Sequence, residues 1–471
     1  MGKVTFGTGG FRAIIGEDFN KDNVIKIAAA ICDEIEREGL VKKVCVGYDN
    51  RFMSETFARW ASEAFASRGV SVIFLDKSVP TPVVMFVAQK LGLDYSIAIT
   101  ASHNPYNYNG VKVFYKAQDA GIETTKVLED IVEKMSLPTL MEFEKGVESG
   151  LIEVANYDRE YLDSIYASFI DVNKIRSYNL KVAFDAMYGS GINTLKMLIE
   201  DFNLNGELLN YYRDAFFGFA LPAPNSETTV KLTETVINNG YDIGFAIDGD
   251  GDRLAIVDSK GNFIDNNWIM ACLYYYYHKK QNKKGDIVKS ICTLNILDKL
   301  ATAFNANCHE VDVGFKNVSR CMNETGAILG GESSGGLAMP GHIAGKDSIF
   351  AICLVINMLC DMEMSIEEII ALVIKEVNGY NTKILEKAYR YPENRKEEIL
   401  NTLLVDKKLP LFNKEVKSVW REKFVKVYFT DDTWTTIRFS GTEPMLRIIA
   451  EVNEGEGEEE VCVPFLEMLS L

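Results

Sequence analysis

Apolar runs along the chain repeat one local order, in which a short run is followed by a small polar loop and then by an amphipathic segment. The three runs and the segments that follow them are residues 44–48 and 55–67, 182–184 and 193–200, and 287–291 and 296–304. A continuous apolar run is typical of a strand buried on both faces, and its alternation with amphipathic helices is typical of parallel sheets covered by helices. The pattern therefore predicts three similar α/β domains with mixed, largely parallel sheets.

A different pattern begins after a turn at Asn378 and Gly379. Pro392 opens a polar helix that extends to about Leu404. Three later segments have the composition of strands, at residues 425–429, 435–439 and 446–452. These elements predict a smaller α+β domain at the C-terminal end. Several domains are also expected from length, because 471 residues exceed a single core at roughly 150 residues per domain.

Composition and charge exclude several classes of partner. The chain has 67 Asp and Glu against 50 Lys and Arg, and its formal net charge of −17 opposes non-specific binding to nucleic acid or anionic lipid. The longest apolar run, residues 349–360, is shorter than the roughly 20 residues of a membrane span, and we interpret it as a buried helix. The nine cysteines form no C-x-x-C pair, which is typical of reduced, buried thiols. With no apolar signal region near the first residue, we expect a cytoplasmic protein with neither nucleic-acid nor membrane partners.

The sharpest chemical signal is the segment AIDGDGDR, in which an apolar strand ends in three carboxylates separated by single glycines. Asp248, Asp250 and Asp252 can converge on one cation only if the backbone curls tightly, and the glycines remove the Cβ obstacle to that curl. An EF-hand is excluded, because its sixth and twelfth loop positions would fall on Arg253 and Ser259. Three monodentate carboxylates leave open positions, as expected for a Mg²⁺ ion that also binds a phosphate oxygen. A polar turn without a cation is the alternative, but carboxylates this close repel one another.

A second segment, IAITASHNP, runs from a strand into a polar loop that contains Ser102 and His103. Ser102 is poorly placed as a hydrolase nucleophile, because the glycines of a nucleophile elbow are missing and the chain has only four histidines. A phosphoserine needs no such elbow. Its charge of about −1.5 to −2 would complete the ligand set of the aspartate loop, so we count Ser102 among the metal ligands. Alone the segment would be an ordinary turn; together with the aspartates it favours phosphoryl transfer.

Two further segments predict phosphate and sugar binding. In IRFSGTEPMLR, the backbone N–H groups and hydroxyls of a tight turn, with Arg438 and Arg447, can cradle a phosphate, although a hairpin with incidental arginines is the alternative. In LGGESSGG, Glu332 and Ser334 stand among four glycines and can accept hydrogen bonds from sugar hydroxyls. Cations lie near these loops in the sequence: Arg12, Lys112, Lys316, His342 and Lys346.

On these segments the chain resembles the α-D-phosphohexomutase family, the phosphoglucomutases and phosphomannomutases. Four motifs match in the family's order and span nearly the whole chain: TASHNP at 100–105, DGDGDR at 248–253, GESSG at 331–335 and RFSGT at 438–442. The resemblance implies four domains around a central cleft, each supplying one loop. The expected domains are a phosphoserine-loop domain at 1–152, a metal-binding-loop domain at 153–264, a sugar-recognition-loop domain at 265–378 and a C-terminal phosphate-binding α+β domain at 379–471.

The resemblance also implies a role for each matched position. Ser102 would be the phosphoserine and the three aspartates would be the Mg²⁺ ligands. Glu332 and Ser334 would recognise the sugar hydroxyls. The clamp for the substrate's distant phosphate would consist of Arg438, Ser440, Gly441, Thr442 and Arg447. Cleft residues that support transfer would be Arg12, His103, Lys112, Arg253 and His342, with Lys316 as a further substrate contact. Lys112 is the preferred proton-transfer residue, and His342 is the second candidate.

The resulting hypothesis is a Mg²⁺-dependent phosphohexomutase for glucose and/or mannose phosphates. Ser102 would exchange its phosphoryl group with the sugar through a 1,6-bisphosphate, and glucose 1,6-bisphosphate or an equivalent would be the activator. A phosphoglucosamine or phosphopentose mutase is the alternative, although Gly336 stands where the phosphoglucosamine branch usually has His. A Mg²⁺-dependent sugar phosphatase and a non-catalytic sugar-phosphate sensor are alternatives of another class. The sequence does not distinguish glucose from mannose as the substrate, or a monomer from a homodimer.

Overall fold

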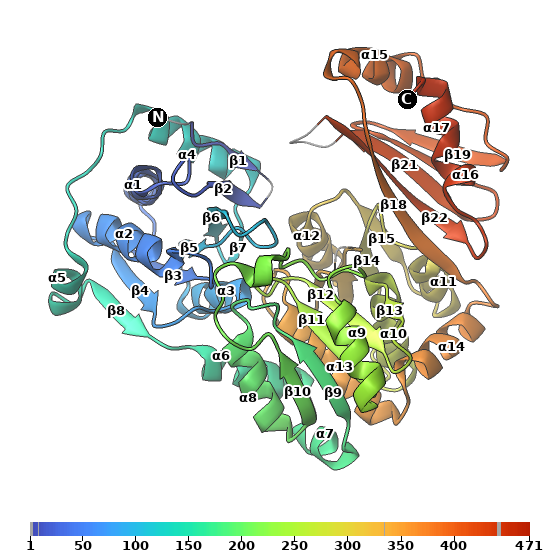
Figure 1. Cartoon of the computed structure of the whole chain (residues 1–471), viewed down its shortest axis with the longest axis horizontal. Coiled ribbons are helices and arrows are strands. Elements are labelled where there is room, and N and C mark those ends of the chain that lie inside the picture. The colour runs from blue at the N-terminus through green and yellow to red at the C-terminus, as the bar shows by residue number, and fades with distance from the viewer. Residues whose placement is uncertain (1–2, 8, 334, 440–443) are drawn as a thin grey trace.

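The computed structural model describes residues 3–7, 9–333, 335–439 and 444–471, which form four domains, each with its own sheet (Figure 1). The first sheet has eight strands in the order β1-β2-β6-β5-β3-β4-β8, with β7 beside β6. Helices α1, α2 and α4 pack on one face and α3 on the other. The elements are β1 Phe6–Gly7, β2 Gly10–Ile14, α1 Lys21–Glu38, β3 Lys43–Tyr48, α2 Ser54–Ser67, β4 Ser71–Leu75, α3 Thr81–Leu91, β5 Tyr95–Ile99, β6 Tyr108–Tyr115, β7 Gln118–Asp119, α4 Ile122–Lys134, α5 Phe143–Glu148 and β8 Ile152–Ala155.

The first sheet extends three residues beyond the expected end of the first domain at residue 152. Strand β8 continues to Ala155 and pairs in parallel with β4 over its whole length, so a boundary after 152 would cut a strand of the first sheet. Its pattern, with Glu153 and Val154 exposed, is that of an edge strand and lacks the continuous apolar run of the inner strands.

The second domain contains a five-stranded sheet in the order β10-β9-β11-β12-β13. Strands β9, β10 and β11 are parallel, whereas β11 and β12 form an antiparallel pair whose connection is the aspartate loop. The elements are α6 Asp158–Phe169, α7 Val172–Tyr178, β9 Lys181–Asp185, α8 Ile192–Phe202, β10 Asn205–Leu209, the 3₁₀ turn η1 Phe217–Phe219, α9 Val230–Asn239, β11 Ile243–Ile247, β12 Leu254–Asp258 and β13 Phe263–Ile264.

The third domain has a four-stranded sheet in the order β15-β14-β16-β17, parallel except for β17. The apolar run at 349–360 lies in α13, which is buried along most of its length and packs against α6, α7 and α10. The elements are α10 Asn266–Lys279, β14 Ile287–Ser290, α11 Ile296–Ala303, β15 Cys308–Val311, α12 Phe315–Thr325, β16 Leu329–Gly331, β17 Leu337–Ala338, α13 Ser348–Met362 and α14 Ile366–Glu376.

The C-terminal domain is an antiparallel sheet in the order β18-β22-β21-β20-β19 with helices on one side. It has an apolar core of its own, whereas one continuous core extends across the first three domains. The elements are β18 Thr382–Arg390, η2 Glu393–Arg395, α15 Lys396–Leu400, the π-helical turn η3 Asn401–Val405, β19 Val416–Arg421, β20 Val425–Phe429, β21 Trp434–Phe439, β22 Met445–Asn453, α16 Glu458–Val461 and α17 Val463–Leu469.

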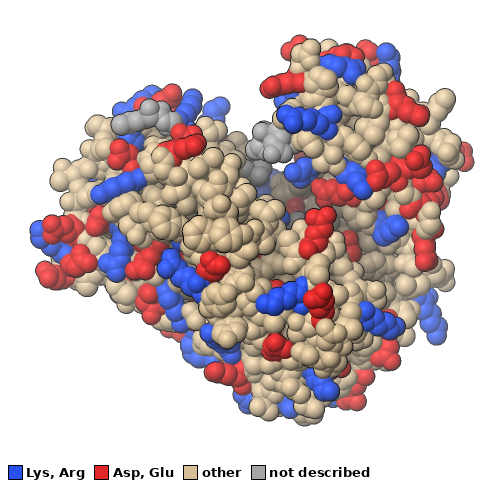
Figure 2. Space-filling view, viewed as in Figure 1, with Lys and Arg blue, Asp and Glu red and all other residues tan. Residues whose placement is uncertain are grey.

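The four domains surround a cleft, as the predicted fold class requires. In Figure 2 a hollow separates the C-terminal domain at the upper right from the first domain at the left. Among the described residues no single helix is long and apolar enough to cross a bilayer; α13 and α14 meet the criterion only as a pair, bent by 81°.

Candidate active site

The three aspartates of the β11–β12 connection form a compact buried cluster. Asp248, Asp250 and Asp252 each offer one carboxylate oxygen, and these oxygens all lie within 4.8 Å of one another. Oδ1 of Asp248 accepts the backbone N–H groups of Asp252 and Arg253 at 2.9 and 3.0 Å, which closes the turn. The sequence therefore folds here into a tight hairpin whose acidic side chains point to one place.

The chemistry of this cluster fits a Mg²⁺ ion. Oδ1 of Asp250 and Oδ1 of Asp252 are buried and accept no hydrogen bond from the described residues, and Oδ2 of Asp250 has only the Lys112 ammonium beside it. Burial and the two neighbouring carboxylates raise the pKa of Asp248 well above its usual value. A divalent cation bound by the three carboxylates would relieve this repulsion, and oxygen ligands are those that Mg²⁺ prefers.

Lys112, on β6, partly compensates the cluster. Its ammonium lies 2.6 Å from Asp250 Oδ2 and 2.7 Å from Asp252 Oδ2, and its side chain is only 6% exposed. Burial by itself disfavours the charge on Lys112, but the two carboxylates outweigh burial and raise the pKa of the ammonium. In this arrangement Lys112 keeps its proton and can donate hydrogen bonds to nearby anions.

Ser102 lies directly against the aspartate cluster. Its hydroxyl donates to Asp248 Oδ2 at 2.9 Å and lies 3.1 Å from Nδ1 of His103, while its backbone N–H donates to the Thr100 hydroxyl at 2.8 Å. The serine has a φ of 53°, a left-handed conformation uncommon for a residue with a Cβ. Such backbone strain persists only where surrounding contacts hold it, and it is frequent at functional sites.

Arg51 holds the serine loop from behind, and sequence reasoning missed it. Its guanidinium is fully buried and donates to four carbonyl oxygens of the loop, those of Ser102, Asn104, Pro105 and Tyr108, at 2.6 to 3.1 Å. Asp49 pairs with this guanidinium at 3.2 Å. A lone Arg after a strand is usually a solvated charge, so no local pattern distinguished it.

The backbone of the aspartate loop is held from three domains. Thr81, the first residue of α3, donates its N–H to the Asp250 carbonyl at 2.9 Å. Ser348, the first residue of α13, donates its hydroxyl to the Gly251 carbonyl at 2.7 Å, and Ser190 donates its N–H to the Gly249 carbonyl at 3.0 Å. The N-terminal ends of α3 and α13 therefore both point at the loop, where their dipoles favour negative charge.

Glycine is required where this loop meets the serine loop. A Cβ on Gly249 would lie 2.7 Å from the Ser102 carbonyl oxygen, and a Cβ on Gly251 would lie 2.9 Å from Pro80. Gly251 also has a φ of 68°. The glycines of DGDGD thus permit close contact between the first and second domains.

Three further predicted residues gather around the same point. Burial, helped by the positive charges of Arg253 and Arg12, lowers the pKa of His103 to about 3, so this imidazole is neutral at pH 7. Arg12 donates to the Asn104 side chain at 2.9 Å. Arg253 Nε lies 4.0 Å from Asp252. Lys346, which the sequence analysis noted only as a nearby cation, reaches to 3.8 Å from Asp252 Oδ2.

The sugar loop is only partly joined to this centre. Glu332 is buried and accepts the N–H of Gly314 at 2.7 Å, which links it to the start of α12, where Lys316 is exposed. Ser334 lies outside the described residues. His342 is placed differently from the expected proton-transfer position, because it stacks on Phe350 and its Nε2 lies 2.7 Å from the buried Asp347. None of the contacts described for His342 reaches Ser102 or the aspartates.

The predicted phosphate clamp of the C-terminal domain includes two opposed arginines. Arg438 on β21 and Arg447 on β22 are register partners, so two like charges stand directly opposite each other. Such a pair is unfavourable unless an anion lies between or beside it, and Glu386 lies 3.7 Å from Arg447. Ser440, Gly441 and Thr442 lie outside the described residues. No hydrogen bond or ion pair among the described residues joins the two arginines to the serine or aspartate loops, which lie across the cleft.

The fold and the site together define a class: a multidomain enzyme whose cleft opposes a metal-binding acidic loop to a serine hydroxyl. Comparison with known proteins agrees with this class. Models of phosphoglucomutase/phosphomannomutase domains match in order: α/β/α domain I at residues 3–138, α/β/α domain II at 159–261, α/β/α domain III at 265–377 and the C-terminal domain at 391–468.

Relatives that match over nearly the whole chain agree with the same family. A phosphoglucomutase/phosphomannomutase of Thermococcus kodakarensis is 30% identical, covering 98% of this chain and 97% of the relative. A Pyrococcus furiosus protein named "Probable phosphoglucosamine mutase" is 29% identical over 98% and 96% of the two chains. The solved structure of a phosphoglucomutase/phosphomannomutase family protein of Burkholderia thailandensis superposes with a TM-score of 0.81 at 21% identity, covering 99% of this chain and 98% of that one. The chain belongs to the phosphoglucomutase/phosphomannomutase family, the α-D-phosphohexomutases, whose members are mutases of the isomerase class.

Proposed function

We propose that the chain interconverts the 1-phosphate and 6-phosphate of a hexose, glucose or mannose, by way of a phosphoryl group on Ser102. One observation supports this most directly: the Ser102 hydroxyl lies 2.9 Å from Asp248, within a buried triad of carboxylates. A phosphate on this oxygen would lie at the mouth of a cation site and close to Arg12 and Lys112, so its charge would be balanced.

The reaction is two phosphoryl transfers in opposite directions. In the first, the free sugar hydroxyl attacks the phosphorus of phosphoserine, its proton leaves, and the bond from phosphorus to the Ser102 oxygen breaks to give a hexose 1,6-bisphosphate. The bisphosphate turns round, the Ser102 oxygen attacks the other phosphorus, and the bond from that phosphorus to the sugar oxygen breaks, so that this oxygen takes up a proton and becomes the free hydroxyl of the product. Mg²⁺ bound by the three aspartates would neutralise charge on the transferred group.

Residues of this chain position the reactants and move the proton. Lys112, a protonated hydrogen-bond donor beside the aspartates, is the proposed proton-transfer residue, and neutral His103 lies within hydrogen-bonding distance of the serine oxygen. Glu332 and Ser334 would bind sugar hydroxyls. Arg438 and Arg447, with the turn at 440–442, would hold the phosphate that does not react, and the sugar's two orientations would exchange the two phosphates between the sites.

The amino-sugar alternative is favoured by the Pyrococcus furiosus relative, whose name specifies phosphoglucosamine. Position 336 favours a neutral hexose. A Cβ on Gly336 would lie 2.4 Å from the Lys346 side chain, so the room that a larger residue would need there is filled by the lysine that approaches Asp252. A coupled assay with glucose, mannose, glucosamine and pentose 1-phosphates distinguishes these substrates directly.

Ser102→Ala tests the phosphoserine itself. We expect turnover to disappear and the ³²P label that the wild type accepts from glucose 1,6-bisphosphate to be lost, because no other described hydroxyl touches Asp248. Ser67→Ala, in the same domain and remote from the cluster, serves as the matched control and should retain both. Near-normal mutase activity in the Ser102 variant would falsify the assignment. Net release of phosphate without isomerisation would indicate a phosphatase, and sugar-phosphate binding without turnover would indicate a sensor.

A further inference from the structure

The third and C-terminal domains meet at a junction that contains an ion pair between the buried Lys426 and Glu310, whose side chain is 27% exposed. Lys426 lies on β20 of the C-terminal domain, and its side chain has no exposed surface. Its ammonium donates to the Ile291 carbonyl at 2.6 Å and to Glu310 Oε2 at 3.0 Å. Both acceptors belong to the third domain. The hydrogen bonds described for this buried charge therefore exist only while the two domains are docked as observed.

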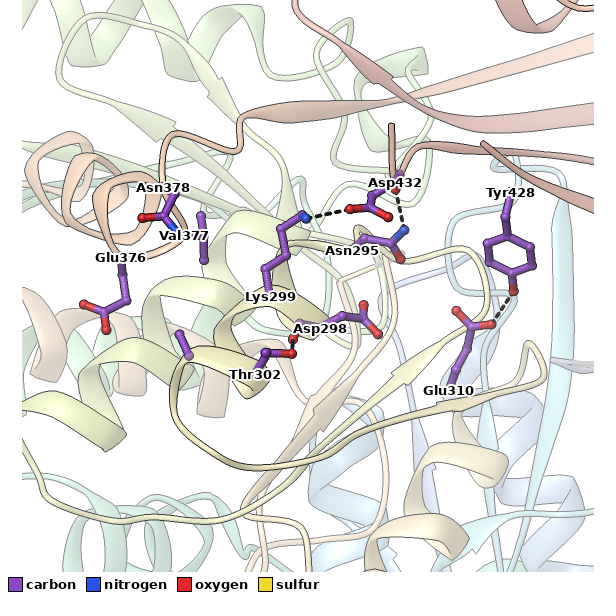
Figure 3. A pocket seen from close by; sticks show the side chains of 11 residues that line it. Asn295, Asp298, Lys299, Thr302, Glu310, Glu376, Val377, Asn378, Tyr428 and Asp432 are labelled. Carbon is purple, nitrogen blue, oxygen red and sulfur yellow. Dashed lines mark hydrogen bonds and ion pairs between the residues drawn. The ribbon is translucent and has the colours of Figure 1, made fainter. Parts of the chain in front are cut away.

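Glu310, on β15, uses both carboxylate oxygens at this junction. Oε1 accepts the hydroxyl of Tyr428 at 2.9 Å, which Figure 3 shows, and Oε2 accepts the ammonium of Lys426. Lys289, fully buried on β14, lies 3.6 Å from the same Oε2. Glu310 thus lies beside two buried ammonium groups from two domains. Burial lowers the pKa of Lys426, and the charge of Glu310 opposes that shift.

A second ion pair at the junction is more exposed, whereas the Asn295 N–H bond to the fully buried Glu451, at 2.9 Å, and an apolar cluster that includes Trp434 also join the two domains. A cavity of about 630 Å³ opens beside the pair, and across it Lys299 reaches Asp432 at 2.9 Å (Figure 3). The side chains of this second pair are 30% and 43% exposed, and exposed ion pairs contribute little to stability. A buried charge that loses its partner, in contrast, is strongly unfavourable. Of these two ion pairs, that of Glu310 and Lys426 is therefore the more sensitive to a change in domain orientation.

We propose that Glu310 and Lys426 fix the orientation of the C-terminal domain on the third domain, and that Glu310 is thereby a positioning residue for the phosphate clamp. Arg438 lies on the strand next to Lys426, since β20 pairs with β21, so any rotation about this junction moves the clamp with it. Glu310 itself has no described contact with the serine, aspartate or sugar loops. The effect of Glu310 on kinetics rests on the proposed function, whereas its effect on the orientation of the C-terminal domain does not.

The structural test measures the distance between the two domains. Spin labels introduced as noncanonical amino acids at the exposed Glu324 on α12 and Glu397 on α15 avoid the nine native cysteines. We expect E310Q to broaden the distance distribution obtained by double electron–electron resonance. The double variant E310Q/K426M should narrow it again, because no unpaired ammonium then remains on β20. A wild-type distribution in E310Q overturns the proposal whatever the activity. If E310Q does not fold, E310D is measured against the same criterion.

The kinetic test uses glucose 1-phosphate as the substrate, with glucose 1,6-bisphosphate supplied. E310Q should raise KM about tenfold and change kcat less than about threefold. In the double variant, adding K426M should partly reverse the increase in KM. The exposed pair of Lys387 and Glu458 within the C-terminal domain provides the matched control, and E458Q should leave both constants unchanged. An unchanged KM in E310Q overturns the positioning role. Absence of turnover in the wild type would instead refute the proposed function and leave the distance measurement to decide this inference.

Discussion

Replacing Arg51 tests whether the serine loop is held in place by one buried guanidinium. Arg51→Met keeps an unbranched apolar side chain of similar reach but removes every donor. Four carbonyl oxygens between Ser102 and Tyr108 then lose a hydrogen bond, and Asp49 loses its ion-pair partner. The change thus removes the connection between the start of α2 and the loop that would be phosphorylated.

The expected loss of unfolding free energy follows from the burial of these groups. Removing one partner of a buried ion pair costs about 3–5 kcal/mol, and each buried carbonyl left unpaired adds roughly 1–3 kcal/mol unless water reaches it. Because these costs overlap, we expect Arg51→Met to lose about 4–6 kcal/mol of unfolding free energy. Arg51→Lys restores the charge but cannot span four acceptors, so we expect it to fold, and to lose about 100-fold in mutase activity through a displacement of the serine by about 1 Å.

Urea unfolding followed by circular dichroism gives the free energies, and a coupled mutase assay gives the activities. Arg59→Met is the matched control, since Arg59 is 39% exposed and pairs with Glu55 and Glu144 at the surface, where the expected loss is about 1 kcal/mol or less. The reasoning is refuted if Arg51→Met unfolds within about 1 kcal/mol of the wild type, or if Arg51→Lys has normal activity.

Three further changes probe the electrostatics and packing of the site. Lys112→Met should tighten Mg²⁺ binding by about tenfold or more in calorimetric titrations while slowing turnover, because it removes a positive charge beside two of the three carboxylates; an unchanged or weaker affinity would contradict this. Because the pKa of His103 is about 3 in the folded protein against 6.5 for the free group, the unfolded state alone gains a proton as the pH falls through 6.5. The dephosphorylated wild type should therefore lose stability between pH 7 and 5, and in His103→Gln this loss should be smaller by on the order of 1–2 kcal/mol, as measured by urea unfolding. Identical losses in the two proteins would refute the assignment. Gly249→Ala should cost about 1–3 kcal/mol and most of the activity, because its Cβ would meet the Ser102 carbonyl, whereas Gly457→Ala, with open space around it, should be neutral in both assays.

Local sequence patterns predicted the helices and strands well where the burial of a residue is set by its neighbours in the sequence. The three expected strand–helix openings are β3–α2, β9–α8 and β14–α11, and the polar segment after Pro392 is helical through the turn at 401–405. The prediction of a largely parallel architecture holds for the first three sheets at their centres. The prediction of strands in the C-terminal part was incomplete because β18 and β19 have polar, half-exposed patterns, and β18 is fixed by pairing with the distant β22.

The supports of the site could not be predicted in the same way. Thr81 and Ser348 open helices, where hydroxyl residues usually only cap the helix, and their contacts with the aspartate loop join residues about 100 or more positions apart. Arg51 is equally hidden, because its acceptors come from a loop more than 50 residues away. Residue type and spacing identify groups that perform chemistry, whereas the groups that hold them are defined by domain docking.

The anchoring of Gly249, Asp250 and Gly251 by three different domains has a consequence for how this enzyme can be assembled or divided. No single domain, expressed alone, contains the donors that shape the metal-binding turn, so fragments that keep all three aspartates should still bind Mg²⁺ poorly. Competence for catalysis then requires that the domains dock on one another, and an alteration at any of their mutual surfaces can inactivate the enzyme without changing a reactive side chain.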